Sequence, residues 1–118
     1  MVVKLELTGH HEVDGTVWYD LQVTNESGRS WVLQKRYNDF SHLHEELKKS
    51  KTLELKALPG KESFNPLKIF DRDGFLDRRS DGLQSYLEAL ANQVQTLAQD
   101  SVLEEFLQVD LSVKPEGA

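Results

Sequence analysis

The sequence contains no cysteine, only three prolines and no long apolar run. Without cysteine the chain can form neither a disulfide nor a thiolate metal site, which fits a reducing compartment such as the cytoplasm. Its longest apolar runs are a few residues, far below the roughly 20 residues that a transmembrane helix needs. No charged-then-apolar signal segment opens the chain. The sequence therefore favours a cytoplasmic protein with no membrane-spanning segment.

Positive charge is also scarce, because 14 basic residues face 20 acidic ones and the formal net charge is −6. Nucleic-acid binding and polybasic membrane binding both depend on a high density of cations, so this balance argues against them. Residues 29–61 are an exception, with eight Lys and Arg against four Asp and Glu. An anion would favour this segment, although a chance cluster of solvated lysines would give the same count.

The 118 residues, of which 38% are hydrophobic, predict one globular domain. Alternating apolar and polar residues predict strands at 3–8, 16–24 and 29–35, with a polar turn at 10–15 and a tight turn at 25–28. At Tyr37 the apolar spacing changes to that of a helix. We expect this helix to run to about residue 49, with Asn38 or Asp39 capping its first turn.

A long connection over 50–74 follows, and loops of this length are usually functional. An apolar stripe from Leu76 to Leu90 then predicts a longer helix. A short last helix begins where Ser101 and Glu104 resemble a capping box. The predicted fold class is α+β, a three-stranded antiparallel meander packed against a helical subdomain of three to four helices with a long proline-containing loop. We assign residues 1–110 to the domain and 111–118 to a C-terminal linker.

Two arginines occupy positions that favour an anionic ligand. Arg36 precedes the first predicted helix, where exposed amides attract anions and an arginine can bind a phosphate through two bonds. Otherwise Arg36 is an ordinary cation at a strand end, and Tyr37 packs on the helix. Arg79 lies on the side of its helix that otherwise faces inward, where a charge is costly unless it is paired or meets a ligand. Its partner is either a ligand or an aspartate such as Asp39.

No pattern typical of catalysis or metal binding is recognisable. His42 and His44 lie two residues apart on a predicted helix and so face different directions, and His10 with His11 belongs to an exposed turn. The segment 71–74 lacks the ligand spacing of a calcium loop. No nucleophile elbow, glycine-rich phosphate loop or Ser/His/Asp arrangement is present. We therefore expect a protein that is not an enzyme, with no catalytic residue, no metal and no cofactor.

Three motifs, in order along the chain, resemble the PX (phox homology) domains of sorting nexins and related proteins. Residues 36–40, Arg-Tyr-Asn-Asp-Phe, followed by Leu43 and Leu47, resemble the family's Arg-aromatic-x-Asp-Phe signature. Residues 58–61, Leu-Pro-Gly-Lys, are similar to its proline segment and lysine. Residues 75–79, Phe-Leu-Asp-Arg-Arg, are similar to the helix in which an arginine precedes a leucine by four residues. The resemblance covers about residues 2–109.

This resemblance implies a phosphoinositide-binding, membrane-targeting module whose ligand is phosphatidylinositol 3-phosphate. It implies that Arg36 binds the 3-phosphate and that Tyr37 forms a flat wall against the inositol ring. Lys61 would contact the phosphate that joins inositol to glycerol, and Arg79 would bond to the 4- and 5-hydroxyls. Because the proline segment here is shorter than usual, the lysine role falls to either Lys61 or Lys56.

The loop after Lys61 contains four apolar residues that can enter the bilayer interface beside a bound headgroup, or can pack back onto the domain. They are Phe64, Leu67, Ile69 and Phe70. The implied location is cytoplasmic and peripheral on endosomal or vacuolar membranes. The implied partners are further domains of a longer parent protein or other proteins, and nucleic acid is not among them. The alternative is a PX-fold protein-interaction module that binds no lipid and uses its acidic surface or the 61–75 loop.

Overall fold

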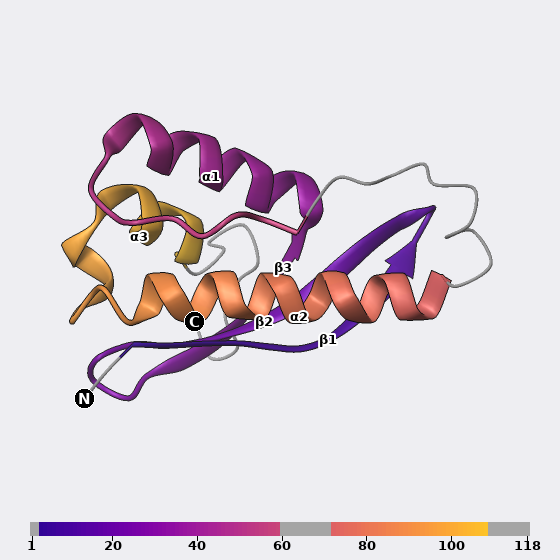
Figure 1. Ribbon diagram of the computed structural model, residues 1–118. Coiled ribbons are helices and arrows are strands. Elements are labelled where there is room, and N and C mark those ends of the chain that lie inside the picture. The colour runs from indigo at the N-terminus through magenta and orange to yellow at the C-terminus, as the bar shows by residue number, and fades with distance from the viewer. Residues whose placement is uncertain (1–2, 60–71, 109–118) are drawn as a thin grey trace.

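The computed structural model describes residues 3–59 and 72–108, which form one sheet and a set of helices (Figure 1). The strands β1 (Lys4–Val13), β2 (Thr16–Thr24) and β3 (Ser30–Arg36) pair antiparallel in the order β1-β2-β3. The helices are α1 (Tyr37–Ser50), α2 (Arg72–Ala91) and α3 (Ser101–Leu107), with the 3₁₀ turn η2 (Leu97–Gln99) before α3. In Figure 1, α2 runs beside β1, and α1 lies beside α3. The predicted α+β meander with its helical subdomain is confirmed.

Several predicted features lie outside the described residues, and they are the linker at 111–118, Lys61, and the loop residues Phe64, Leu67, Ile69 and Phe70.

The β1–β2 hairpin turns at two residues with positive φ, Asp14 (51°) and Gly15 (80°), as a tight two-residue hairpin turn requires. The predicted polar turn at 10–15 was too long, because residues 10–13 continue β1. The reason is a β-bulge, since Leu7 pairs with Leu21 but Gly9 pairs with Asp20. The extra residue reverses which side chains face inward, so the alternation that identifies a strand is interrupted there.

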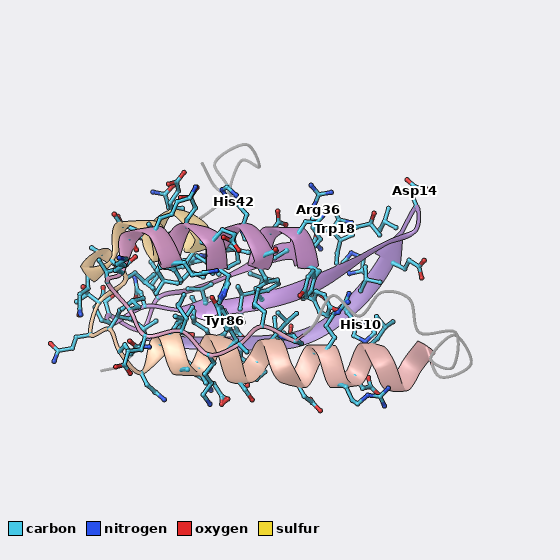
Figure 2. The ribbon with its side chains drawn as sticks, turned by 45° about the horizontal axis from the view of Figure 1, so that its top comes forward. His10, Asp14, Trp18, Arg36, His42 and Tyr86 are labelled. Carbon is cyan, nitrogen blue, oxygen red and sulfur yellow. The ribbon has the colours of Figure 1, made fainter. Side chains whose placement is uncertain are left out.

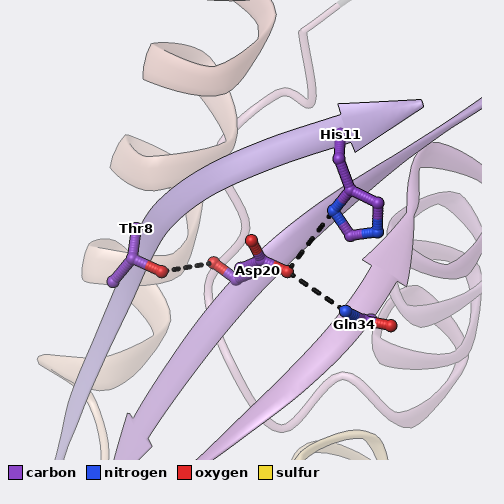
Figure 3. A network of polar contacts seen from close by, with 4 residues as sticks. All are labelled: Thr8, His11, Asp20 and Gln34. Carbon is purple, nitrogen blue, oxygen red and sulfur yellow. Dashed lines mark hydrogen bonds and ion pairs between the residues drawn. The ribbon is translucent and has the colours of Figure 1, made fainter.

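The outward face of the sheet is polar and is linked across its three strands by the carboxylate and backbone of Asp20 (Figure 3). Gln34 on β3 donates to the carboxylate at 3.4 Å, and His11 on β1 lies 3.7 Å from it. Thr8, the extra residue of the bulge, donates to the backbone oxygen of Asp20 at 3.4 Å. Such long, exposed contacts contribute little to stability. They identify this face as the side turned to solvent.

The core lies between the inward face of the sheet and the three helices. Buried side chains that share this core include Tyr19, Leu21 and Val23 from β2, Phe40, Leu43 and Leu47 from α1, Leu83, Tyr86, Leu87 and Leu90 from α2, and Leu103 and Leu107 from α3. The apolar spacing in the sequence therefore identified the inward side of β2, α1 and α2. Aromatic contacts connect the layers, since the ring of Phe40 lies 6.2 Å from that of Tyr19 and 5.5 Å from that of Phe106.

The two helix starts differ in detail from the prediction. At α1 the N-cap residue is Arg36, and Asp39 acts from the third helical position by accepting the Arg36 backbone N–H at 2.9 Å. At α3 the cap is Asp100 and not Ser101, because the Asp100 carboxylate accepts the Leu103 N–H at 3.0 Å. Asp100 also accepts a hydrogen bond from the hydroxyl of Thr52, which explains how a carboxylate that is only 5% exposed is satisfied.

Two glutamines, Gln84 on α2 and Gln93 two residues after its end, bind the backbone of neighbouring segments. The side-chain amide of Gln84 accepts the Leu7 N–H at 2.7 Å and donates to the Leu5 carbonyl at 3.0 Å, so it pairs with the edge of β1 as a strand would. Gln93 makes the same pair of bonds with the backbone of Glu54, both at 2.7 Å. These bonds attach α2 to the sheet, and they attach the turn after α2 to the segment that leads toward Pro59.

We predict that Gln84→Ala lowers the free energy of unfolding by roughly 1 to 3 kcal/mol, because two partly buried backbone groups lose their partner. Urea denaturation measures this change. The control is Gln95→Ala, which removes an exposed glutamine side chain and should change stability by less than about 0.5 kcal/mol. Equal stability of the two variants would show that the Gln84 bonds contribute nothing.

We also predict a specific loss of stability in alkali from Tyr86. Its side chain is 1% exposed, its hydroxyl lies 2.9 Å from His44 Nδ1, and burial raises the pKa of Tyr86 to about 12. The unfolded chain has a tyrosine pKa near 10, so it releases the proton first and folding weakens as the pH rises from about 10 toward 12.

Tyr86→Phe removes this titration and leaves Tyr19 in both proteins. The stability advantage of the parent over Tyr86→Phe should shrink by about 1 kcal/mol between pH 9 and pH 11, as measured by urea denaturation at each pH. An advantage that stays constant with pH would contradict the assignment.

Candidate functional site

A pocket of about 260 Å³ lies where the β1–β2 hairpin meets the first turn of α1 and the inward side of α2. Its described lining residues come from three parts of the chain: Gly15, Thr16, Val17 and Tyr19 from the hairpin, Arg36, Tyr37 and Asn38 from the start of α1, and Arg79 from α2. Arg36, Tyr37 and Arg79, which were selected from the sequence, thus line one pocket. None of the described lining residues is acidic.

Arg36 stands at the rim, where β3 ends and α1 begins. Its guanidinium carbon lies 5.8 Å from the centre of the Trp18 ring, and its Nε lies 3.9 Å from the Asp39 carboxylate. Figure 2 shows Arg36 and Trp18 together at this end of α1, with Asp14 beyond them at the hairpin tip. Because the contact with Asp39 uses Nε, the two terminal nitrogens can still bind an anion in a bidentate manner.

Tyr37 is fixed through its ring and through its hydroxyl. The guanidinium carbon of Arg79 lies 4.2 Å from the ring centre, which is a cation–π contact. The Tyr37 hydroxyl donates to the Pro59 carbonyl at 2.5 Å. Pro59 in turn packs against α2 at Gly82, where an added Cβ would lie only 3.0 Å from the Pro59 side chain. Tyr37 therefore connects the start of α1, the segment that ends at Pro59, and α2.

Arg79 is half-buried between two tyrosines. Tyr19, which is fully buried below the pocket, has its pKa raised by burial, and the positive charge of Arg79 acts in the opposite direction. Asp39, the alternative partner considered from the sequence, faces Arg36 instead. The inward position of Arg79 is thus explained by its contact with Tyr37 and by its place in the pocket.

Sequence reasoning missed several residues of this site. Tyr19 and Thr16 have the pattern of ordinary strand residues, and nothing local indicates that they line a pocket with Arg79. Gly82 did carry a signal, because an isolated glycine inside a helix often marks a close packing contact. Lys56 is exposed and does not line the pocket, and Lys61 lies outside the described residues.

The described residues contain no candidate metal site. Within 3–59 and 72–108, no three His, Cys, Asp or Glu side chains gather in a way that could hold a metal ion. The two helical histidines have different neighbours, since His42 lies 3.7 Å from Glu46 and His44 contacts Tyr86. In the same ranges, no helix is both long enough and apolar enough to cross a bilayer.

Comparisons with known proteins place this geometry in a family. The PX domain family matches residues 23–110. Sorting nexin-11 from Bos taurus, Homo sapiens and Mus musculus is in each case 37% identical over 88 residues, which cover 74% of this chain and 31% of the relative. This chain therefore matches less than a third of the length of these relatives.

Among solved structures, "X-ray structure of a designed CISK-PX domain" superposes with a TM-score of 0.70 at 25% identity. The superposition covers 90% of this chain and 99% of that one. The family match spans most of the chain and includes Arg36, Tyr37 and Arg79, the residues that meet in the pocket. The chain belongs to the PX domain family.

Proposed function

We propose that this chain targets membranes by binding phosphatidylinositol 3-phosphate in the pocket lined by Arg36, Tyr37 and Arg79. Membership of the PX family and similarity to sorting nexins support, in general terms, a phosphoinositide-binding module of membrane trafficking. The proposal of this particular ligand rests on one observation. Two arginines line the same pocket, and no described residue of its lining is acidic. Such a pocket suits a ligand that presents phosphate and hydroxyl groups together.

The two arginines are proposed to act differently because their surroundings differ. Arg36 is exposed and lies at the N-terminus of α1, where the helix dipole and unpaired backbone amides add to the attraction for a phosphate. It therefore binds the 3-phosphate. Arg79 is half-buried and held against the Tyr37 ring, so its orientation is restricted and it bonds to the 4- and 5-hydroxyls. Tyr37 forms the wall against which the inositol ring lies.

Lys61 and the loop that follows it are proposed to complete the contact with lipid. Lys61 comes two residues after Pro59 in the sequence. We assign Lys61 to the phosphate between inositol and glycerol, with Lys56 as the alternative. The apolar residues Phe64, Leu67, Ile69 and Phe70 are assigned to the bilayer interface.

Binding of this kind is reversible recognition without turnover. A single headgroup contact is expected to have a Kd in the micromolar range, and a second module or a dimer can strengthen it by avidity. The proposed location is the cytoplasmic surface of endosomal or vacuolar membranes. The proposed binding domain is residues 1–110.

We predict that Arg36→Gln lowers binding to liposomes containing phosphatidylinositol 3-phosphate at least about tenfold, because charge-assisted bonds worth roughly 1.5 to 3 kcal/mol each are lost. Arg79→Gln should weaken binding and also relax the discrimination against headgroups phosphorylated at position 4 or 5. The matched control is Lys49→Gln, an exposed cation at the far end of α1, which should act only through weak, salt-sensitive attraction. Co-sedimentation across the phosphoinositide series measures all three variants.

Melting curves and the variant Arg79→Lys, which keeps the charge but not the planar guanidinium, separate binding effects from folding effects. If the three glutamine variants weaken binding equally, the attraction is generic electrostatics and the pocket has no role. If none of them matters, the protein-interaction alternative without lipid binding replaces this proposal.

A further inference from the structure

A second, larger cavity of about 480 Å³ lies between α1 and α3, two helices that run side by side in Figure 1. We call it the α1–α3 groove. Three apolar side chains line it: Leu43 from α1, which is buried, and Val102 and Phe106 from α3, which are half-buried. The exposed apolar surface of the groove thus comes from Val102 and Phe106 on α3, with Leu43 buried beneath it.

Carboxylates stand on both sides of this apolar lining. Asp39 and Glu46 lie two helical turns apart on α1, and Glu105 lies on α3. Asp39 makes only a long ion pair of 3.9 Å with Arg36, and Glu46 faces an imidazole, which is charged only when protonated. Among the described residues, the exposed carboxylate of Glu105 has no ion-pair partner. The groove is therefore acidic, in contrast to the pocket at Arg36 and Arg79.

One lining residue of the groove already places a cation on its apolar surface. The ammonium of Lys35, from β3, lies 4.4 Å from the centre of the Phe106 ring. An ammonium over an aromatic face gains cation–π attraction while its alkyl chain packs on apolar surface. Lys35 is thus an example, within the chain, of a cation with an alkyl stem packed on this lining, and the carboxylates beside Val102 favour a second such group.

We propose that the α1–α3 groove is a docking site for a basic peptide segment of a partner protein. An apolar side chain of the segment packs on Val102 and Phe106, and neighbouring Lys or Arg side chains pair with Glu46 and Glu105. Charge complementarity selects this occupant. The chain's own residues 109–118 contain two acidic residues and one lysine, a second copy carries a net charge of −6, and an anionic membrane would be repelled by the carboxylates.

The proposal is tested by selecting peptides that bind the 118-residue chain from a random decapeptide library. Peptides that bind the double variant Glu46→Lys/Glu105→Lys are removed from the library first. The enriched peptides should carry Lys or Arg next to a large apolar residue. Fluorescence anisotropy with the most enriched peptide then compares single variants. Glu46→Lys and Glu105→Lys should each lower its affinity at least about fivefold.

The matched control is Glu45→Lys, which makes the same charge change on the same helix outside the groove and should alter peptide affinity less than about twofold. Binding to phosphatidylinositol 3-phosphate should be unchanged in Glu105→Lys, which separates this site from the headgroup pocket.

Three results would overturn the proposal. One is a selection that enriches no peptide or enriches acidic ones. Another is equal loss of peptide binding in Glu45→Lys and Glu46→Lys, which would mean attraction to the acidic surface as a whole. The third is a dimer of the parent chain in analytical ultracentrifugation that Glu46→Lys dissociates, because the occupant would then be a second copy.

Discussion

The contact between the Arg79 guanidinium and the Tyr37 ring, at 4.2 Å, determines how the pocket is assembled. It connects α2 with the first residue of α1, and the Tyr37 hydroxyl extends the connection to Pro59, which returns to α2 at Gly82. Arg79, Tyr37 and Pro59 therefore form a closed series of contacts that begins and ends on α2. A guanidinium on the inward side of a helix is costly in an apolar setting. The Tyr37 ring offsets part of that cost, and the guanidinium belongs to the lining of the pocket where a ligand can bind.

Helix α1 separates two regions of opposite charge. Its N-terminus, with Arg36 at the rim, belongs to a pocket without acidic lining in the described part of the chain, whereas its side carries Asp39 and Glu46 into the α1–α3 groove. A protein with a net charge of −6 is repelled by an anionic membrane in general, so attraction has to be local. Asp39 lies at the boundary of the two regions, because it lines the groove and also contacts Arg36, a lining residue of the pocket. In this account one helix presents a lipid-binding end and a protein-binding side.

Periodicity in the sequence predicted the fold class, the three strands and the inward faces of α1 and α2, because these depend on local alternation of apolar residues. The family resemblance predicted that Arg36, Tyr37 and Arg79 belong together. Local signals failed where a distant contact decides the outcome. The bulge at Thr8 interrupts the alternation of β1, and Asp100 caps α3 with support from Thr52, a residue 48 positions away. The close approach of Pro59 to Gly82 likewise depends on tertiary packing that no local pattern contains.

The most direct test of the account is an NMR titration of the chain, labelled with nitrogen-15, with soluble inositol 1,3-bisphosphate. We expect the largest shifts at the backbone amides of Thr16 and Asn38 and at the side-chain Nε signals of Arg36 and Arg79, with saturation at a single site. The amides of α1 near Lys49, which lie far from the pocket along the helix, should not move. Shifts distributed over the exposed lysines, or their absence from the two arginines, would contradict a headgroup pocket between α1, α2 and the hairpin.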